Sequence, residues 1–260
     1  EVKITLGYEN HYEGVEFQGF VSAIGSKIPL EIKCEDAMWK IRRRNINKAF
    51  GKTSLKEILT EIVKDTGIEL SDKVPELKVE KWICQNVTGA KALQDIKENL
   101  MLTVFIDDEG KLYAGLQQLD NVGNAVVYDL NYNLVENNLE YKRADEKRLR
   151  VRYTYIDKQN KKKTVEVGDE DGEIRTFHTS VVSDEAKMRE AAENELKKLK
   201  YDGFEGSVKS FLIPFATRGM SAVIRDNEHK NREGKYFIKK VNTTFSTSGA
   251  RRDISISNKL

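Results

Sequence analysis

Apolar and polar side chains alternate along the first 34 residues of the chain. The alternation covers residues 3–8, 15–23 and 28–34. A period of two is typical of half-buried strands, because successive side chains point to opposite faces of a sheet. The second segment places Val15, Phe17 and Val21 on one face, with Gly19 between them. The pattern therefore predicts three strands, with a bend at the glycine.

The period changes to that of helices between residues 45 and 130. An apolar stripe at helical spacing consists of Leu55, Ile58, Leu59, Ile62 and Val63. Thr53 or Ser54 is predicted to cap its start, with Glu57 as the capping-box partner of Ser54, and Gly67 is predicted to cap its end. A second helix is predicted after Thr88, which caps its start. Further strands are predicted over residues 74–84, 102–107 and 111–116.

Strands dominate again from residue 139. They are predicted over residues 139–143, 149–156, 164–168, 174–178, 204–213, 221–225, 234–246 and 251–257. One helix, capped by Ser183 or Asp184 and running to Lys200, has a thin apolar face, so we expect it on a surface. Alternating strands at this spacing favour a barrel or sandwich over a parallel sheet.

These patterns predict a β-rich α+β fold with two barrel-like antiparallel β domains and an α/β insert. Residues 1–45 are assigned to the first barrel, 46–134 to the insert, and 135–260 to the second barrel with its surface helix. The chain starts inside a predicted strand and without methionine, so we expect it to be cut from something longer. The opening residues do not resemble a signal peptide.

The charge balance argues against two classes of partner. The 260 residues include 44 lysines and arginines and 42 aspartates and glutamates, a net charge of +2. This is too little for a strongly basic nucleic-acid binder or a polybasic membrane binder. No apolar run approaches the 18 or so residues of a membrane-spanning helix. Two cysteines are too few for a disulfide framework, which favours a reducing, intracellular place of synthesis.

No common catalytic or metal-binding constellation is present in the sequence. His11, His178 and His229 each lack a second histidine at ligand spacing. The acidic segment 168–173 has its glycine too early for a calcium loop, so we interpret it as a hairpin tip. The basic clusters 42–44 and 161–163 are interpreted as solvated faces. The sequence therefore predicts no enzyme, no cofactor and no metal.

Each end of the chain carries several short motifs, which follow one another in a fixed order. The N-terminal motifs are Gly7-Tyr8, Phe17-Gln18-Gly19-Phe20-Val21 and Cys34-Glu35-Asp36. The C-terminal motifs are Gly234-Lys235-Tyr236-Phe237-Ile238-Lys239-Lys240-Val241 and a final strand after a glycine turn. In this order they resemble the phage late control D family, the tail hub proteins of contractile-tailed phages. The chain departs from the family at Arg218-Gly219, where the family has Pro-Gly.

The resemblance implies a structural role in a virion tail baseplate, after synthesis in a bacterial cytoplasm. Such hubs form trimers with pseudo-sixfold symmetry that join a tail tube to a spike. Their lumen passes a polymer without specific nucleic-acid binding, and they need no cofactor. The family's first barrel begins with strands upstream of the one that starts here, so Glu1 would lie inside that barrel.

The resemblance also directs attention to particular side chains. We expect Gly19 and Gly234 at bends or tight turns, and Gly219 at the turn that replaces Pro-Gly. Obligate interfaces need apolar anchors, and the candidates are Phe211, Phe215, Tyr236 and Phe237. The alternative for each aromatic ring is an ordinary place in the core.

Two other functions stay open. One is the hub of a type VI secretion system or of an extracellular contractile injection apparatus. The other is a tail-associated hydrolase of cell-wall polymer, which would need a close pair of carboxylates in a cleft.

Overall fold

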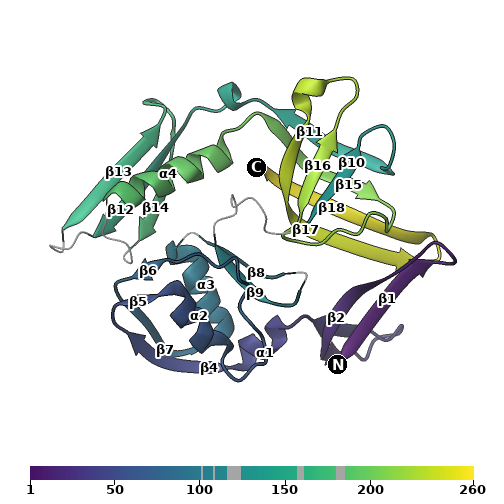
Figure 1. Cartoon of the computed structure of the whole chain (residues 1–260), viewed down its shortest axis with the longest axis horizontal. Helices are drawn as coiled ribbons and strands as arrows, with labels where there is room; N and C mark the ends of the chain where they lie inside the picture. The colour runs from purple at the N-terminus through teal and green to yellow at the C-terminus, as the bar shows by residue number, and fades with distance from the viewer. Residues whose placement is uncertain (101, 108, 116–123, 157–160, 180–184) are drawn as a thin grey trace. The chain divides into compact units, whose positions relative to one another are not determined.

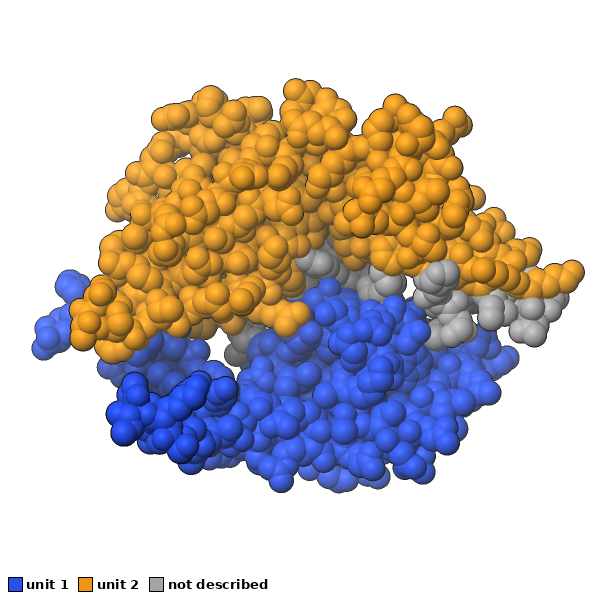
Figure 2. Space-filling model, turned by 180° about the vertical axis from the view of Figure 1, so that it is seen from behind, with its two compact units in different colours: residues 1–116 blue, residues 117–260 orange. Residues whose placement is uncertain are grey.

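Strands outnumber helices in both parts of the protein. The computed structural model describes residues 1–260 except 101, 108, 116–123, 157–160 and 180–184. It divides into two compact units, residues 1–116 and 117–260 (Figures 1 and 2). The described residues form a β-rich fold with four α-helices and several sheets, none of which closes into a barrel within them. None of the described helices is long and apolar enough to cross a membrane.

An antiparallel three-stranded sheet opens the first unit. It consists of β1 (Val2–Tyr8), β2 (Tyr12–Ile24) and β3 (Ile32–Glu35), in that order. The predicted strand over residues 28–34 is wrong in its first half, where Ile28 is fully exposed. The Gly25 N–H donates to the Glu31 carbonyl at 2.7 Å, which closes a loop there. Pro29 inside that loop has no N–H for a strand ladder.

The rest of the first unit combines three helices with small two-stranded sheets. Its elements are α1 (Met38–Arg43), β4 (Asn45–Phe50), β5 (Thr53–Ser54), α2 (Leu55–Val63), β6 (Lys78–Val79), β7 (Trp82–Thr88), α3 (Gly89–Leu100), β8 (Thr103–Ile106) and β9 (Leu112–Gly115). The predicted stripe of α2 is buried. The capping box is confirmed, since Glu57 N donates to Ser54 Oγ and Ser54 N donates to the Glu57 carboxylate. Thr88 also caps α3, accepting from Lys91 N at 3.3 Å.

Two further local predictions in this unit are wrong, and one strand was missed. Helix α2 ends at Val63 with Lys64 as its C-cap, so Gly67 does not cap it. The predicted strand 74–84 is two strands, β6 and β7. Strand β4 was not predicted, because Ile46 is its one buried residue and leaves no alternation to detect.

A six-stranded sheet forms the centre of the second unit. Its order is β10 (Ala125–Asp129), β16 (Ser221–Arg225), β17 (Gly234–Ser246), β18 (Gly249–Lys259), β15 (Gly203–Ser210) and β11 (Glu136–Lys142). Strands β10 and β16 are parallel, and the other neighbours are antiparallel. One face carries the core, with Tyr128, Tyr236 and Ile254 fully buried.

A smaller layer is inserted into this sheet. It comprises β12 (Leu149–Ile156), β13 (Lys162–Gly168), β14 (Glu173–Thr179) and α4 (Glu185–Leu199). Lys142 and Gly203 face each other in the pair β11–β15, so residues 143–202 leave and re-enter the sheet at one point. Strands β12 and β14 are parallel, which the sequence did not predict. Helix α4 packs on β12 and β13 through Met188 and Ala192, and the exposed side chains of its other face fit the expected surface position. Its predicted cap, Ser183 or Asp184, lies outside the described residues.

Candidate functional site

The three histidines belong to different parts of the chain, His11 to the first unit and His178 and His229 to the second. His11 is exposed in the turn between β1 and β2, and His229 is exposed in the loop before β17. His178 belongs to β14, but its side chain lies outside the description. In the described part of the chain, no three histidine, cysteine, aspartate or glutamate side chains come together as a metal site would require.

The acidic segment 168–173 connects β13 to β14, but it is not the predicted hairpin tip, because each of these two strands pairs with β12 and not with the other. Asp169 accepts from Leu149 N at 3.0 Å and from Lys200 Nζ at 2.5 Å. The hydrogen bond from Lys200 is the main cause that lowers the pKa of Asp169. Asp171 pairs with Arg148 at 2.6 Å. These carboxylates fasten the turn to β12.

The basic cluster 42–44 is engaged within the first unit. Arg42 Nη2 donates to Glu35 Oε1 at 2.8 Å, and the Arg43 guanidinium lies 4.3 Å from the centre of the Trp39 ring. Arg44 Nη2 donates to Glu61 Oε1 at 3.0 Å, and its side chain is 18% exposed. The interpretation of this cluster as a solvated face is wrong for Arg44.

Glu61 makes the first unit sensitive to acid. A hydrogen bond from Lys48 is the main cause that lowers the pKa of Glu61. A carboxylate with a lowered pKa stabilises the fold above its unfolded pKa of about 4.3, and this is lost as the pH falls through the folded pKa. We expect Glu61→Gln to cost about 1 kcal/mol at pH 7 and to flatten the loss of stability below pH 4. Urea unfolding at a series of pH values measures this.

The matched control is Glu76→Gln. Glu76 pairs with Lys56 at 2.7 Å, but its side chain is 77% exposed. We expect the control to leave the pH profile unchanged, because exposed pairs contribute little. Equal profiles for the two variants would contradict the role of Glu61.

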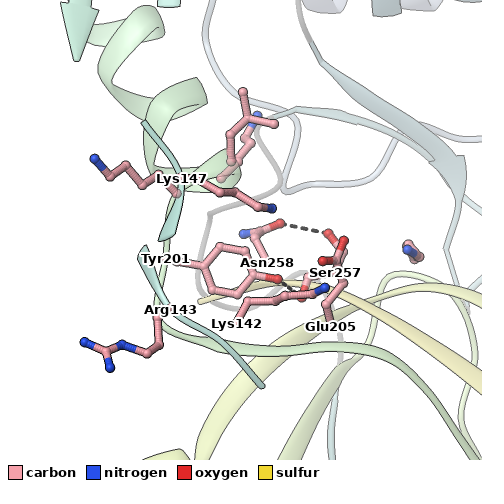
Figure 3. A pocket seen from close by; sticks show the side chains of 11 residues that line it. Lys142, Arg143, Lys147, Tyr201, Glu205, Ser257 and Asn258 are labelled. Atoms are coloured by element: carbon pink, nitrogen blue, oxygen red, sulfur yellow. Dashed lines mark hydrogen bonds between the residues drawn. The ribbon is translucent and has the colours of Figure 1, made fainter. Parts of the chain in front are cut away.

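A cavity of about 160 Å³ lies where the inserted layer joins the six-stranded sheet (Figure 3). It is lined by Lys142, Arg143, Lys147, Lys198, Leu199, Lys200, Tyr201, Glu205, Lys239, Ser257 and Asn258. Most of the cations are paired: Lys142 with Glu140, Arg143 with Asp145, Lys198 with Glu195 and Lys200 with Asp169. Arg143 points away from the cavity in Figure 3. The positive charge is therefore largely neutralised.

Polar contacts at this cavity hold the junction together. The Tyr201 hydroxyl donates to the Ser257 carbonyl at 3.4 Å (Figure 3), and burial raises the pKa of Tyr201 to about 12. Ala144 N donates to the Asp202 carboxylate at 2.8 Å, which joins the two connecting segments. Lys198 lies at the C-terminus of α4, where a cation is favoured by the helix dipole. These contacts give the polar side chains around the cavity a structural role, which does not require a bound ligand.

The sheet β1–β2–β3 carries an apolar face that is not buried. We call it the N-terminal face. The strand register assigns the following residues to it: Val2, Ile4, Leu6, Tyr8, Tyr12, Phe17, Val21, Ile24, Ile32 and Cys34. All are at least partly exposed. Bulges at Glu16 and Ser22 keep the face apolar by resetting the alternation. The bulge at Glu16 turns Val15 to the opposite face, so the prediction that Val15 shares a face with Phe17 is wrong.

A second exposed apolar group lies in the second unit. This C-terminal patch consists of Phe211, Ile213 and Phe245, which are 47%, 47% and 66% exposed. Phe245 faces Ala250 across β17 and β18, and the Arg251 guanidinium lies 4.7 Å from the centre of the Phe211 ring. Phe211 and Phe245 therefore lie near the end of the sheet where β17 turns into β18.

The aromatic residues singled out in the sequence lie in different environments. Phe211 is part of the C-terminal patch. Phe215 is packed against the core, 5.0 Å from the guanidinium of Arg252. Tyr236 and Phe237 are buried, and the Tyr236 hydroxyl accepts from Phe204 N at 2.9 Å. Of the four, Phe211 presents the most accessible ring to a partner.

The three glycines occupy close approaches and a turn. A Cβ on Gly19 would lie 2.1 Å from the Glu35 carbonyl oxygen. Gly219 has φ 93° in the turn before β16, and its N–H donates to the Ile238 carbonyl. A Cβ on Gly234, at the start of β17, would meet the flexible end of Lys259 at 2.6 Å.

The sequence reasoning missed Arg252, which is 1% exposed. It donates to the carbonyls of Leu212 and Ala216 at 3.0 and 3.1 Å. The signal was its place in an alternating strand, since position 252 shares its face with the buried Ala250 and Ile254. A polar residue at a buried position must find partners.

Comparison with known proteins gives a likeness of fold. No family model and no curated protein matches the chain. A tail protein from Neisseria meningitidis MC58 matches with a TM-score of 0.64 and 13% identity, over 94% of this chain and 80% of that one. The 43 kDa tail protein of prophage MuSo2 from Shewanella oneidensis matches with a TM-score of 0.62 and 13% identity, over 94% and 78%. An Escherichia coli type VI secretion component, described as similar to the T4 tail proteins gp27 and gp5, matches with a TM-score of 0.57 and 8% identity, over 98% and 63%. The chain thus has the fold of phage tail proteins, and the resemblance inferred from its motifs is confirmed at that level.

Proposed function

We propose that the protein is a structural baseplate hub of a phage or prophage contractile tail. Its fold supports this, because it matches tail proteins over 94% of the chain with TM-scores of 0.64 and 0.62. Its work is mechanical: three copies form a pseudo-sixfold ring that joins the tail tube to the spike. The partners are a second and third copy, the tube protein and the spike protein. The protein acts in the virion after synthesis in the bacterial cytoplasm.

The proposed ring uses two barrel-like domains of each copy. We assign residues 1–45 to the first, 135–260 to the second and 46–134 to the α/β insert. The open sheet of residues 1–35 and its exposed apolar face support this assignment, because an open sheet edge needs a cover. Strands that pair with this open edge complete the first barrel. A polymer passes through the lumen without specific binding, and no cofactor is involved.

A hub of a type VI or extracellular contractile injection apparatus is the second candidate. The likeness to the Escherichia coli type VI component favours it, at a TM-score of 0.57. The two candidates share the ring, and they differ in the spike. A β-helical spike domain encoded downstream in the same gene would favour the secretion apparatus.

Hydrolysis of cell-wall polymer requires two carboxylates that face one cleft. Among the described residues that line the cavity of Figure 3, Glu205 is the one carboxylate. The likeness of the fold to tail proteins supports a non-enzymatic role. Turnover of peptidoglycan by the purified protein, abolished by Glu205→Gln, would contradict it.

The first test of the hub is the molar mass in solution. We expect light scattering behind a sizing column to give about three times the 29.8 kDa of one chain, over a range of concentrations. The mass of a single chain at every concentration would contradict the trimer.

A further inference from the structure

We propose that the inserted layer, residues 143–202, opens as a unit of its own while the six-stranded sheet stays folded. The layer joins that sheet at one point, because Lys142 and Gly203 face each other in the pair β11–β15. Its three described strands pair only with one another. The layer is therefore a hinged module, which can come away from the sheet without breaking any of the sheet's strand pairs. This holds whether or not the protein is a baseplate hub.

The layer and the sheet have separate cores. In the described part of the chain, the core of the six-stranded sheet takes in one side chain from residues 143–202, that of Tyr201. The layer buries a set of apolar side chains between its own strands and α4: Leu149, Val151, Tyr153, Tyr155, Val165, Met188 and Ala192. Apolar burial stabilises the core in which it occurs. Little of it is therefore shared between the layer and the sheet.

A polar cavity lies at the junction of the two cores. Leu199 at the end of α4 and Asn258 of β18 both line the cavity of Figure 3, and six of its eleven lining residues are lysine or arginine. The hydrogen bond from the Tyr201 hydroxyl to the Ser257 carbonyl spans the junction at 3.4 Å, which is long compared with the usual distance of about 2.7–2.8 Å. Polar junctions of this kind allow the parts that they join to move.

Three features weaken the layer. A segment of about 60 residues has a small core and is marginally stable on its own. The Tyr153 hydroxyl is buried and has no hydrogen-bond partner among the described residues, which lowers stability. Helix α4 is thinly apolar, and its described buried residues are Met188 and Ala192. We therefore expect the layer to open at a lower free energy than the sheet.

Hydrogen exchange of the full chain, read peptide by peptide with mass spectrometry, tests this directly. A series of urea concentrations below the unfolding transition separates partial openings from global unfolding. We expect the amides of β12, β13, β14 and α4 to share one opening. Urea should promote it at lower concentrations than the opening shared by β15, β17 and β18. A single opening common to both sets of amides would overturn the proposal.

A matched pair of variants assigns the two openings. Val151 in β12 and Val208 in β15 are both fully buried, the first in the layer and the second in the sheet. We expect Val151→Ala to speed exchange in the layer by about 10-fold or more and to leave the sheet unchanged, because the cavity that it creates lies in the core of the layer. Val208→Ala is expected to speed exchange in the sheet and to leave the layer unchanged.

Two other results would contradict the module. Exchange that is faster by the same factor in layer and sheet of Val151→Ala would show that they form one cooperative unit. Faster exchange of the layer in Val208→Ala would show that the layer depends on the sheet for its fold. Circular dichroism spectra equal to that of the wild type show that the variants are folded. If either variant does not fold, the urea series on the wild-type chain decides between one opening and two.

Discussion

Replacing Arg252 by leucine is expected to lower the free energy of unfolding of the second unit by about 3 kcal/mol. The arginine side chain is buried, and its guanidinium donates to the carbonyls of Leu212 and Ala216. Leucine fills part of the space but has no donor. Two buried carbonyls then lose their hydrogen-bond donors, and each such loss costs about 1–3 kcal/mol. The segment between β15 and β16 would detach from the sheet.

The two tryptophans make this measurable. Trp39 and Trp82 both lie in the first unit, so their fluorescence reports on that unit alone. We expect the variant to shift the urea transition seen by circular dichroism, while the fluorescence transition stays where it is in the wild type. An equal shift of both signals would contradict a local role of Arg252.

Two further substitutions show what the guanidinium supplies. Arg252→Lys keeps the charge but cannot reach both carbonyls with one planar group, so we expect an intermediate loss. Arg251→Leu removes the neighbouring arginine, whose contact with Phe211 lies at the surface. We expect less than about 1 kcal/mol for that change. A loss for Arg251→Leu equal to that for Arg252→Leu would show that position in the strand, not the buried contacts, sets the cost.

Much of the fold could be predicted because strands and helices differ in period. The stripe and capping box of α2 come from residues close in sequence, and both are confirmed. The wrong predictions fall where a local event interrupts the period. A bulge at Glu16 moves Val15 to the other face, and a closed loop removes Ile28 from β3. The alternation of apolar and polar residues does not reveal a β-bulge, in which one extra residue has no partner on the neighbouring strand.

Strand partners were beyond the reach of the pattern. The parallel pairs β10–β16 and β12–β14 join segments 96 and 24 residues apart at their first paired positions, Ala125 with Ser221 and Leu149 with Glu173. Alternation tells which side chains share a face, but it does not tell which strand lies alongside. The register had to come from tertiary packing.

The candidate surface shows the same limit. Phe211 and Tyr236 follow similar apolar patterns in the sequence, yet one ring is 47% exposed and the other is buried. The difference depends on what covers each ring, and the cover comes from distant segments. The sequence could therefore supply the aromatic candidates, and the structure had to separate the exposed ring from the core.

Replacing Gly19 by alanine is expected to destabilise the sheet β1–β2–β3 by about 2–3 kcal/mol. The added Cβ would lie 2.1 Å from the carbonyl oxygen of Glu35 and 2.7 Å from the ring of Phe17. The backbone of Glu35 must then move, because a carbonyl in a strand cannot rotate away as a long side chain can. Glu35 faces Phe20 across β2 and β3 and binds Arg42, so both contacts would be disturbed.

Trp39 reports on this change directly, because its ring stacks on Phe20 at 4.9 Å. We expect the fluorescence transition of Gly19→Ala to shift to lower urea, while the β-sheet of the second unit unfolds as in the wild type. The matched control is Gly51→Ala, where a Cβ meets no atom within 4 Å. The control should be slightly more stable than the wild type, because alanine has less conformational freedom in the unfolded chain. If Gly19→Ala behaves like the control, β3 does not approach β2 at Gly19 as closely as the structure shows.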